Sequence, residues 1–341
     1  MNNLSTFYCS AYYIPIITAY SIPTGNPIYH VAQDISNKDV IHLSTSHAFW
    51  TKNHADEVPF LVTGTAEFGY REGNASISAQ FRHIKSFAQT NSRTFILVDT
   101  YNKCLRQLDI TAKSTSMLVG VCDGRGSKGT SSEVLFTKPT DISIRGQFSY
   151  ITDSGSDTIY IMMLIDGVDG SPLIEKLDRS FSSPTSVAVT ANPMVFYAAV
   201  NAGIKKVNFS DGSLIVETIN TNAALISQDN DVLSKISWLD KEKTSLAVVN
   251  QYTGFIGMID LNTENFPLLT VCSACHTPGA CAQVTDPMAV TIRETSSPDV
   301  QELVIALRNG SIITTADSRT LQDTAVSSTT CSSSPSFLKG L

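Results

Sequence analysis

The chain has 341 residues and a formal net charge of −7, with 42% hydrophobic and only 16% charged residues. Ser and Thr together number 76, made up of 41 Ser and 35 Thr. This composition argues against helical bundles, whose exposed faces need Glu, Lys and Arg, and favours short strands joined by polar turns. The acidic balance excludes a generally basic nucleic-acid surface, and no apolar run reaches the ~18 residues of a membrane span.

The first 22 residues have an uncharged start and an apolar middle. A secretory signal peptide normally begins with basic residues, which this segment lacks. Two interpretations stay open for 1–22: a cleaved signal, or an ordinary strand over Tyr13–Tyr20. Cleavage would remove Cys9 and leave six cysteines, an even number suited to three disulfides.

One sequence phrase recurs along the chain: an apolar anchor, a Pro two or three residues later, and then alternating apolar positions. Its clearest copies are FTKPTDISI, FSSPTSVAV and VTDPMAVTI, and a degenerate copy begins near Pro27. The anchors, which include two weaker copies, are Phe81, Phe136, Phe181, Val232 and Val284, spaced 55, 45, 51 and 52 residues apart. A repeat of this length is typical of stacked supersecondary units.

A second phrase follows each copy and consists of two apolar strands around a polar turn with Asp, Asn or Gly. It covers residues 95–110, 150–164, 195–209, 245–261 and 303–315. Three or four short strands at this spacing predict an all-β fold, a six-bladed β-propeller of four-stranded antiparallel blades. We expect the propeller to span 23–325, with the strand over Tyr13–Tyr20 completing the last blade. The Ser/Thr-rich stretch 326–341 then forms a tail that resembles a linker.

The units over 62–87 and 119–142 resemble the NHL-repeat family of β-propellers, because both follow its strand-Gly-loop-Gly-loop-Phe pattern. The stretch ILVDTYNKCLRQLD resembles the family's strand-turn-strand motif, with Asp99, Asn102 and Arg106 at its motif positions. The resemblance is good over 60–165 and only a pattern over 180–320. It implies the propeller fold and says little about function.

Six-bladed relatives include calcium-dependent hydrolases and lyases, whose ligands surround the central channel. By that resemblance Asp99, Asp153, Asn201 and Asn250, which recur after the second strand of successive blades, become candidate Ca²⁺ ligands. The alternative is turn formation, because Asp and Asn side chains accept backbone N–H groups at such positions. No other cofactor is expected.

Cys104 and Cys122 are expected on neighbouring strands of one blade and therefore form a candidate disulfide. Another group of cysteines, with His276 nearby, suits local disulfides best; zinc and covalent haem are weaker alternatives. This group consists of Cys272, Cys275, Cys281 and Cys331. His42, His47 and His54 could bind a metal or act as bases, but their spacing favours surface positions.

Sequons at Asn3, Asn74, Asn208 and Asn309 are candidate glycosylation sites and, with the even cysteine count, favour an extracellular protein. Our first hypothesis is a non-enzymatic extracellular or cell-surface scaffold that binds a protein or glycan partner through propeller-face loops. The second is a calcium-dependent hydrolase or lyase with a site in the channel. The third, an intracellular ligase-type or RNA-binding propeller, predicts free thiols and a basic face.

Overall fold

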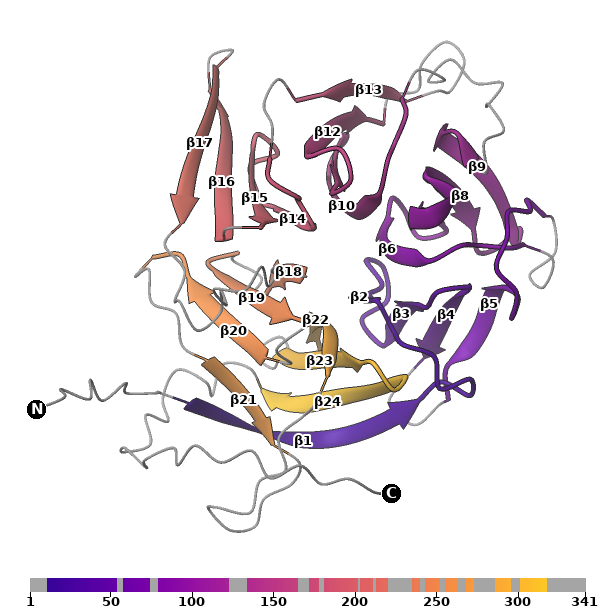
Figure 1. Ribbon diagram of the computed structural model, residues 1–341. Helices are drawn as coiled ribbons and strands as arrows, with labels where there is room; N and C mark the ends of the chain where they lie inside the picture. Colours follow the sequence, from indigo (N-terminus) through magenta and orange to yellow (C-terminus); the bar gives the residue numbers. More distant parts are fainter. Residues whose placement is uncertain are drawn as a thin grey trace, which may run out of the picture.

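The protein is a six-bladed all-β propeller, as the sequence predicts (Figure 1). The computed structural model describes residues 11–53, 58–73, 79–122, 134–164, 172–177, 181–201, 203–210, 213–219, 235–239, 243–251, 255–262, 268–272, 286–295 and 301–317. The innermost strand of each blade faces the central channel, and the later strands lie progressively outward. No helix in these ranges is long and apolar enough to cross a membrane.

Each blade is a four-stranded antiparallel meander. Blade 1 contains β2 (His30–Gln33), β3 (Val40–Ser44), β4 (Ala48–Asn53) and β5 (Phe60–Gly64). Blade 2 contains β6 (Ile84–Gln89), β7 (Thr94–Asp99), β8 (Cys104–Asp109) and β9 (Ser114–Gly120), with the 3-10 turn η1 (Thr100–Asn102) between β7 and β8. Blade 3 contains β10 (Pro139–Arg145), β11 (Phe148–Asp153), β12 (Thr158–Met163) and β13 (Leu173–Lys176).

The second half of the ring follows the same plan. Blade 4 contains β14 (Ser186–Val189), β15 (Val195–Val200), β16 (Gly203–Ser210) and β17 (Ser213–Ile219). Blade 5 contains β18 (Lys235–Trp238), β19 (Ser245–Asn250), β20 (Phe255–Asp260) and β21 (Leu268–Cys272). Blade 6 contains β22 (Pro287–Glu294), β23 (Gln301–Leu307), β24 (Ser311–Asp317) and the N-terminal strand β1 (Ala11–Ser21).

Apolar side chains fill the spaces between neighbouring blades, and each of the six interfaces has its own buried cluster in the described residues. Between blades 1 and 2 the rings of Phe49 and Phe87 stand edge to face, with centroids 4.9 Å apart, and Phe95 packs beside them. The repeated anchors Phe81, Phe136 and Phe181 are also buried here or at the next interfaces. Stacking therefore hides both faces of each sheet from water.

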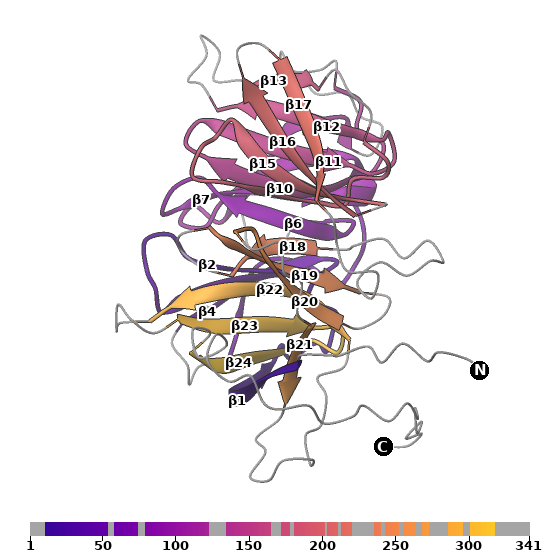
Figure 2. The same ribbon diagram turned by 90° about the vertical axis from the view of Figure 1, so that its left-hand side faces the viewer.

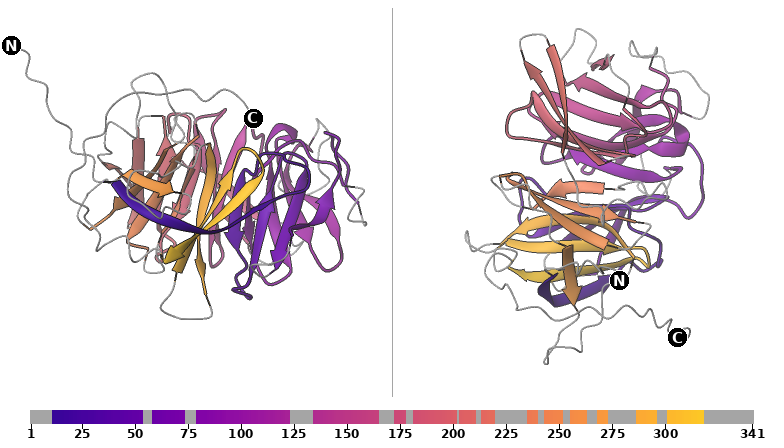
Figure 3. Two further views of the ribbon diagram at one scale, coloured as in Figure 1. Left: turned by 90° about the horizontal axis from the view of Figure 1, so that it is seen from below. Right: turned by 60° about the vertical axis from the view of Figure 1, so that its left-hand side comes forward.

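β1 closes the ring. Its second half pairs antiparallel with β24, from Ile16 opposite Thr315 to Ser21 opposite Ser311. Its first half pairs parallel with β21, from Ala11 opposite Leu268 to Pro15 opposite Cys272. One strand thus completes blade 6 and also ties it to blade 5, which Figures 2 and 3 show from the side and from below. The predicted strand over Tyr13–Tyr20 therefore lies within β1, and cleavage of residues 1–22 stays a prediction.

Removing β1 is expected to destabilise the whole propeller, because blade 6 would lose its fourth strand and β24 would become an open edge. A chain beginning at Ile22 should unfold at a lower temperature than the full chain, and a synthetic peptide of residues 11–21 should restore much of the difference. The measurement is calorimetry with and without the peptide.

A matched control peptide carries Thr18→Pro and Ala19→Pro, which remove ladder N–H groups and should abolish the rescue. Equal melting temperatures for the shortened and full chains would contradict the closing role of β1.

Candidate functional site

On two of the inner strands, β14 and β18, channel-facing N–H groups donate to side chains of the preceding blade. The N–H of Val187 on β14 donates to Asp141 Oδ2 at 3.0 Å, and the N–H of Val189 donates to Ser143 Oγ at 3.1 Å. One blade further on, the N–H of Ile236 donates to Ser186 Oγ at 3.0 Å. Inner strands have no neighbour on this side, so the side chains replace the missing strand.

Apart from Ser143, these side chains occupy one equivalent position of the repeat. The residue at this position of each inner strand pairs with the last or the next-to-last residue of the second strand. The six pairs are His30 with Ser44, Ser86 with Val98, Asp141 with Thr152, Ser186 with Ala199, Lys235 with Val249 and Ala289 with Ala306. Five of these six positions carry polar side chains, which the ring brings together.

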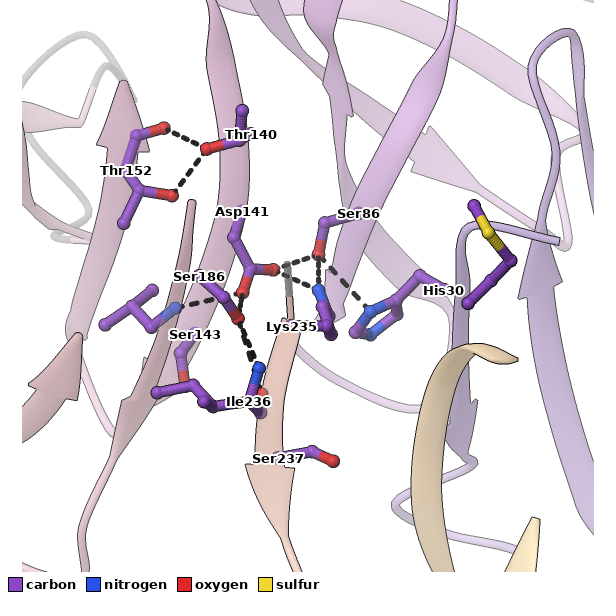
Figure 4. Close-up of polar contacts among 12 residues, drawn as sticks. His30, Ser86, Thr140, Asp141, Ser143, Thr152, Ser186, Lys235, Ile236 and Ser237 are labelled. Atoms are coloured by element: carbon purple, nitrogen blue, oxygen red, sulfur yellow. Dashed lines mark hydrogen bonds and ion pairs between the residues drawn. The ribbon is translucent and has the colours of Figure 1, made fainter. Parts of the chain in front are cut away.

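We call His30, Ser86, Asp141, Ser186 and Lys235 the channel plug (Figure 4). Lys235 Nζ reaches across the channel to Asp141 Oδ1 at 2.5 Å and to Ser86 Oγ at 3.1 Å. The hydroxyl groups of Ser86 and Ser186 both donate to the Asp141 carboxylate. His30 Nδ1 lies 3.5 Å from Ser86 Oγ at the edge of this network. The plug therefore links blades 1 to 5 through one carboxylate.

The plug is buried and its charges depend on one another. Burial acts to raise the pKa of Asp141, but Lys235 and the other donors outweigh it, and the pKa lies below its usual value. Burial, and then Lys235, hold the pKa of His30 well below its usual value, so that imidazole is neutral at pH 7. Burial lowers the pKa of Lys235, and Asp141 opposes that shift. The centre of the plug is thus the Lys235–Asp141 pair with hydroxyl groups around it.

Further along the inner strands, toward their C-terminal ends, the channel widens beyond the plug into a cavity of about 350 Å³. In all six blades the residue two places after the plug position, or after the equivalent Ala289 in blade 6, has a small side chain. These residues are Ala32, Ala88, Ser143, Ala188, Ser237 and Thr291. The rest of the lining includes Trp238, Gln33, Gln89, Phe87, Lys243 and Ile and Val side chains of the inner strands. The cavity exists because these positions lack the volume to fill the centre of the ring.

We call the opposite end of the propeller the turn face, because the turns between the second and third strands of each blade lie there. Asp99 and Asp153 end the second strands of blades 2 and 3 on this face. Asp99 Oδ1 accepts the N–H of Arg82 at 2.8 Å, and Asp153 accepts the N–H groups of Thr137 and Lys138 at 2.8 and 2.6 Å. Both aspartates hold the segment that leads into the inner strand.

Asp99 also joins the residues of the NHL-like motif. Its Oδ2 accepts a hydrogen bond from Asn102 Nδ2 at 2.8 Å and lies 3.4 Å from the guanidinium group of Arg106. Arg106 is fully buried. The Arg106 guanidinium lies 4.4 Å from the ring centre of Phe81 and donates to the carbonyl of Arg71. Burial raises the pKa of Asp99, and Arg106 opposes that shift. The motif residues thus form a structural ion pair inside blade 2.

The four predicted calcium ligands do not share one register. Asp99, Asp153 and Asn250 each end a second strand, but Asn201 lies one residue beyond the end of β15, in a shorter turn. The two carboxylates are engaged inside their own blades, so their oxygens do not fit a Ca²⁺ ion in the channel. In the described ranges no three His, Cys, Asp or Glu side chains are grouped as metal ligands. The geometry favours the turn-forming alternative, and the calcium site stays a prediction.

Asn201 differs from its partners in one further respect. Its Oδ1 is buried without a hydrogen-bond partner, whereas Asn250 is fully buried and does interact with other groups. Neither observation places the two asparagines beside the aspartates.

The structure contains the predicted disulfide between Cys104 on β8 and Cys122 just beyond β9, with Cα atoms 5.2 Å apart. Both cysteines are fully buried. The backbone of Cys272 ends β21, but its side chain and Cys275, His276, Cys281 and Cys331 lie outside the described residues, so their pairing stays a prediction.

The expectation of surface histidines is wrong for His42. It is buried, and its ring bridges Asp34 Oδ2 and Thr51 Oγ1, each at 2.9 Å. β3 is covered on both faces, and the His42 ring lies 4.6 Å from that of Phe95 of blade 2. The side chain is therefore a buried hydrogen-bonding group and not a surface group. His47 is partly buried, with its ring centroid 3.8 Å from that of Phe68, and His54 lies outside the described residues.

Two of the sequons fall on described residues. Asn309 is exposed in the turn between β23 and β24, whereas Asn208 is partly buried within β16 and pairs with strands on both sides. Asn3 and Asn74 lie outside the described residues. Glycosylation at all of them stays a prediction, with Asn309 in the most accessible setting.

A groove of about 390 Å³ opens on the turn face at blade 2. We call it the aromatic groove; its lining includes Phe68, Tyr70, Arg82, His83 and Tyr101. Phe68 and Tyr101 are 59% and 51% exposed, although both are large apolar rings. His83 stands between the groove and Tyr29, whose ring centroid lies 4.1 Å away. The turn face thus offers exposed aromatic surface beside the channel mouth.

No model of a known protein family matches this chain, and no curated protein matches it either. The propeller fold therefore rests on the structure, and the NHL resemblance rests on sequence pattern.

Arg106→Met is expected to cost about 3–5 kcal/mol of unfolding free energy, because it leaves the buried Asp99 carboxylate without its counter-charge. The control is Arg93→Met, which removes a 3.2 Å pair with Asp109 whose arginine is largely exposed and should cost less than about 1 kcal/mol. Denaturant unfolding measures both; similar losses would contradict a structural role for the Arg106 pair.

Lys235→Met is expected to cost about 3 kcal/mol at pH 7, because Asp141 would stay buried and ionised. Without Lys235 the pKa of folded Asp141 should rise above the unfolded value. Protonation then favours the folded state, so the loss relative to the wild type should shrink from pH 7 to pH 5. Denaturant unfolding at the two pH values measures this.

The control for this variant is Lys235→Met combined with Asp141→Asn, which removes both charges and should recover most of the lost stability at pH 7. A Lys235→Met loss below about 1 kcal/mol with no pH dependence would show that the plug carries no strong ion pair.

Proposed function

We propose that this chain is a non-enzymatic extracellular interaction scaffold, a divergent NHL-like propeller that binds a protein partner on its turn face. The observation that carries the proposal is the pair of exposed rings, Phe68 and Tyr101, on either side of a groove with Arg82 and His83 in its lining. Aromatic residues and Arg are enriched where protein interfaces bury their energetic centres.

The framework beneath the groove supports this proposal. The carboxylate of Asp99 fixes the segment at Arg82, and Asn102 donates to the carbonyl of Gly69 at 2.8 Å, which ties the two sides of the groove together. A surface held in place before binding loses less conformational entropy when a partner docks. The groove is therefore rigid in the part that presents its side chains.

The extracellular part of the proposal draws support from the Cys104–Cys122 disulfide, which lies in the same blade as the groove. Disulfides persist in oxidising compartments and are rare in the cytosol. Low charge and the exposed sequon at Asn309 agree with this setting.

Phe68→Ala and Tyr101→Ala are each expected to weaken partner binding about tenfold or more, because each removes an exposed ring from the centre of the interface. A photo-crosslinking amino acid in place of Glu67, next to Phe68 at the rim of the aromatic groove, identifies the partner. Titration calorimetry with the purified partner then measures the affinity of each variant. The control is Leu173→Ala, which removes an apolar side chain, 47% exposed, from the outer strand of blade 3.

Unchanged affinity of the Phe68 and Tyr101 variants for the crosslinked partner would overturn the proposed surface. Binding to a glycan array that is lost in the same two variants would replace the protein partner with a glycan.

A further inference from the structure

Among the described residues, two lysines beside the channel plug form no ion pair. Lys85 lies on β6 at a bulge next to Ser86, and Lys138 directly precedes β10. In the described part of the chain neither ammonium group makes a hydrogen bond or ion pair with a side chain, whereas Lys235 is held by Asp141. Lys85 is partly buried and Lys138 is exposed.

The charges at this mouth of the channel are unbalanced. Lys85 lies close enough to Lys138, Lys235 and Asp141 to be influenced by all three charges. Two carboxylates lie beside these three ammonium groups, and both are already engaged: Asp141 accepts Lys235, and Asp153 accepts the backbone N–H groups of Thr137 and Lys138. Burial first, and then the charges of Lys138 and Lys235, lower the pKa of Lys85 to about 8. A negatively charged group brought to this point would relieve the repulsion.

The cationic mouth is continuous with the aromatic groove. The His83 ring contacts Tyr101 in the groove, at a centroid distance of 5.2 Å, and also senses the charges of Lys85 and Lys138. Burial, followed by these lysines, lowers the pKa of His83 to about 4, so the histidine is neutral at pH 7. The positive charge beside the channel mouth at neutral pH therefore comes from the two lysines and from Arg82, whereas Glu72, which accepts the hydroxyl group of Tyr70 at 2.7 Å, brings negative charge to the groove.

We propose that the partner presents a short acidic peptide segment to the turn face, with carboxylates over Lys85 and Lys138 and an apolar side chain in the aromatic groove. This inference rests on the proposed function and specifies the partner's chemistry. The net charge of −7 disfavours long polyanions such as nucleic acids, because the rest of the molecule repels them. A short segment carries fewer negative charges than a nucleic acid and therefore experiences less of that repulsion, and its aromatic group adds apolar contact.

The test uses the full-length protein and a fluorescein-labelled twelve-residue peptide of Glu with one central Phe, and fluorescence anisotropy measures its affinity. Lys138→Met should weaken binding about fivefold and Lys85→Met about tenfold, since the second charge is partly buried. A peptide with Gln in place of Glu should bind the wild-type protein weakly. Its affinity should be as low as that of the Glu peptide for the Lys85→Met, Lys138→Met double variant. Lys176→Met, which removes an exposed lysine from β13, is the matched control and should not change the affinity.

The pH dependence is an independent arm of the test. The ammonium form of Lys85 is the binding form, so affinity of the wild type should fall as pH rises from 7 to 9. Lys85→Met should lack this change. The Lys85→Met variant should also melt at the same temperature as the wild type or higher, because the substitution removes an uncompensated charge from a partly buried site. The variant therefore stays folded and its binding can be measured.

The outcomes separate this inference from the proposed function. If Phe68→Ala weakens binding of the crosslinked partner while the lysine variants and the Gln peptide behave like their parents, the turn face is a docking surface but its partner is not acidic. If free glutamate competes as well as the peptide, the site binds small carboxylates, which overturns the peptide proposal. If neither set of variants changes partner binding, the proposed function fails as well.

Discussion

The propeller depends on one constraint: each blade is a sheet with two apolar faces and needs a neighbour on both. Six buried clusters, one at each interface, satisfy that requirement, and they do so only when the ring is closed. Closure in turn places six edge strands around a channel, where their N–H groups would face one another unpaired. Asp141, Ser143 and Ser186 satisfy these groups from the preceding blade. The polar residues at the centre of the molecule thus follow from the packing of its apolar ones.

Most of the fold could be predicted from sequence, because the repeated Phe anchors and the strand hairpins that follow them mark the blades directly. The Cys104–Cys122 pairing could be predicted for the same reason, since register between adjacent strands fixes which side chains meet. Asn201 shows the limit of this reasoning. Its blade has a shorter turn, with Val200 opposite Gly203, so Val200 and not Asn201 takes the position equivalent to Asp153.

The channel plug could not be recognised as a unit, because its members are about 50 residues apart and belong to five different blades. A signal was nevertheless present. Asp141 and Ser186 each follow a repeated Pro by two residues, and Asp141 takes the polar position of an alternating pattern whose apolar positions are Ile142 and Ile144. A polar residue that recurs at an inward position in several repeats is evidence for a shared polar centre. The charge environment of Lys85 could not be predicted from the sequence, since Lys138, Lys235 and Asp141 come to it from other blades.

The position of β1 also affects how the chain reaches its native state. The ribosome releases residues 11–21 before the other strands of the propeller, yet their partners on β24 lie about 290 residues later in the sequence. The first strand of the propeller is consequently among the last to find its place, and until then it remains open to pairing with other chains. Pairing of β1 with β24 is therefore delayed until translation has reached β24. During that time a chaperone or a neighbouring nascent chain can pair with the open edge of β1.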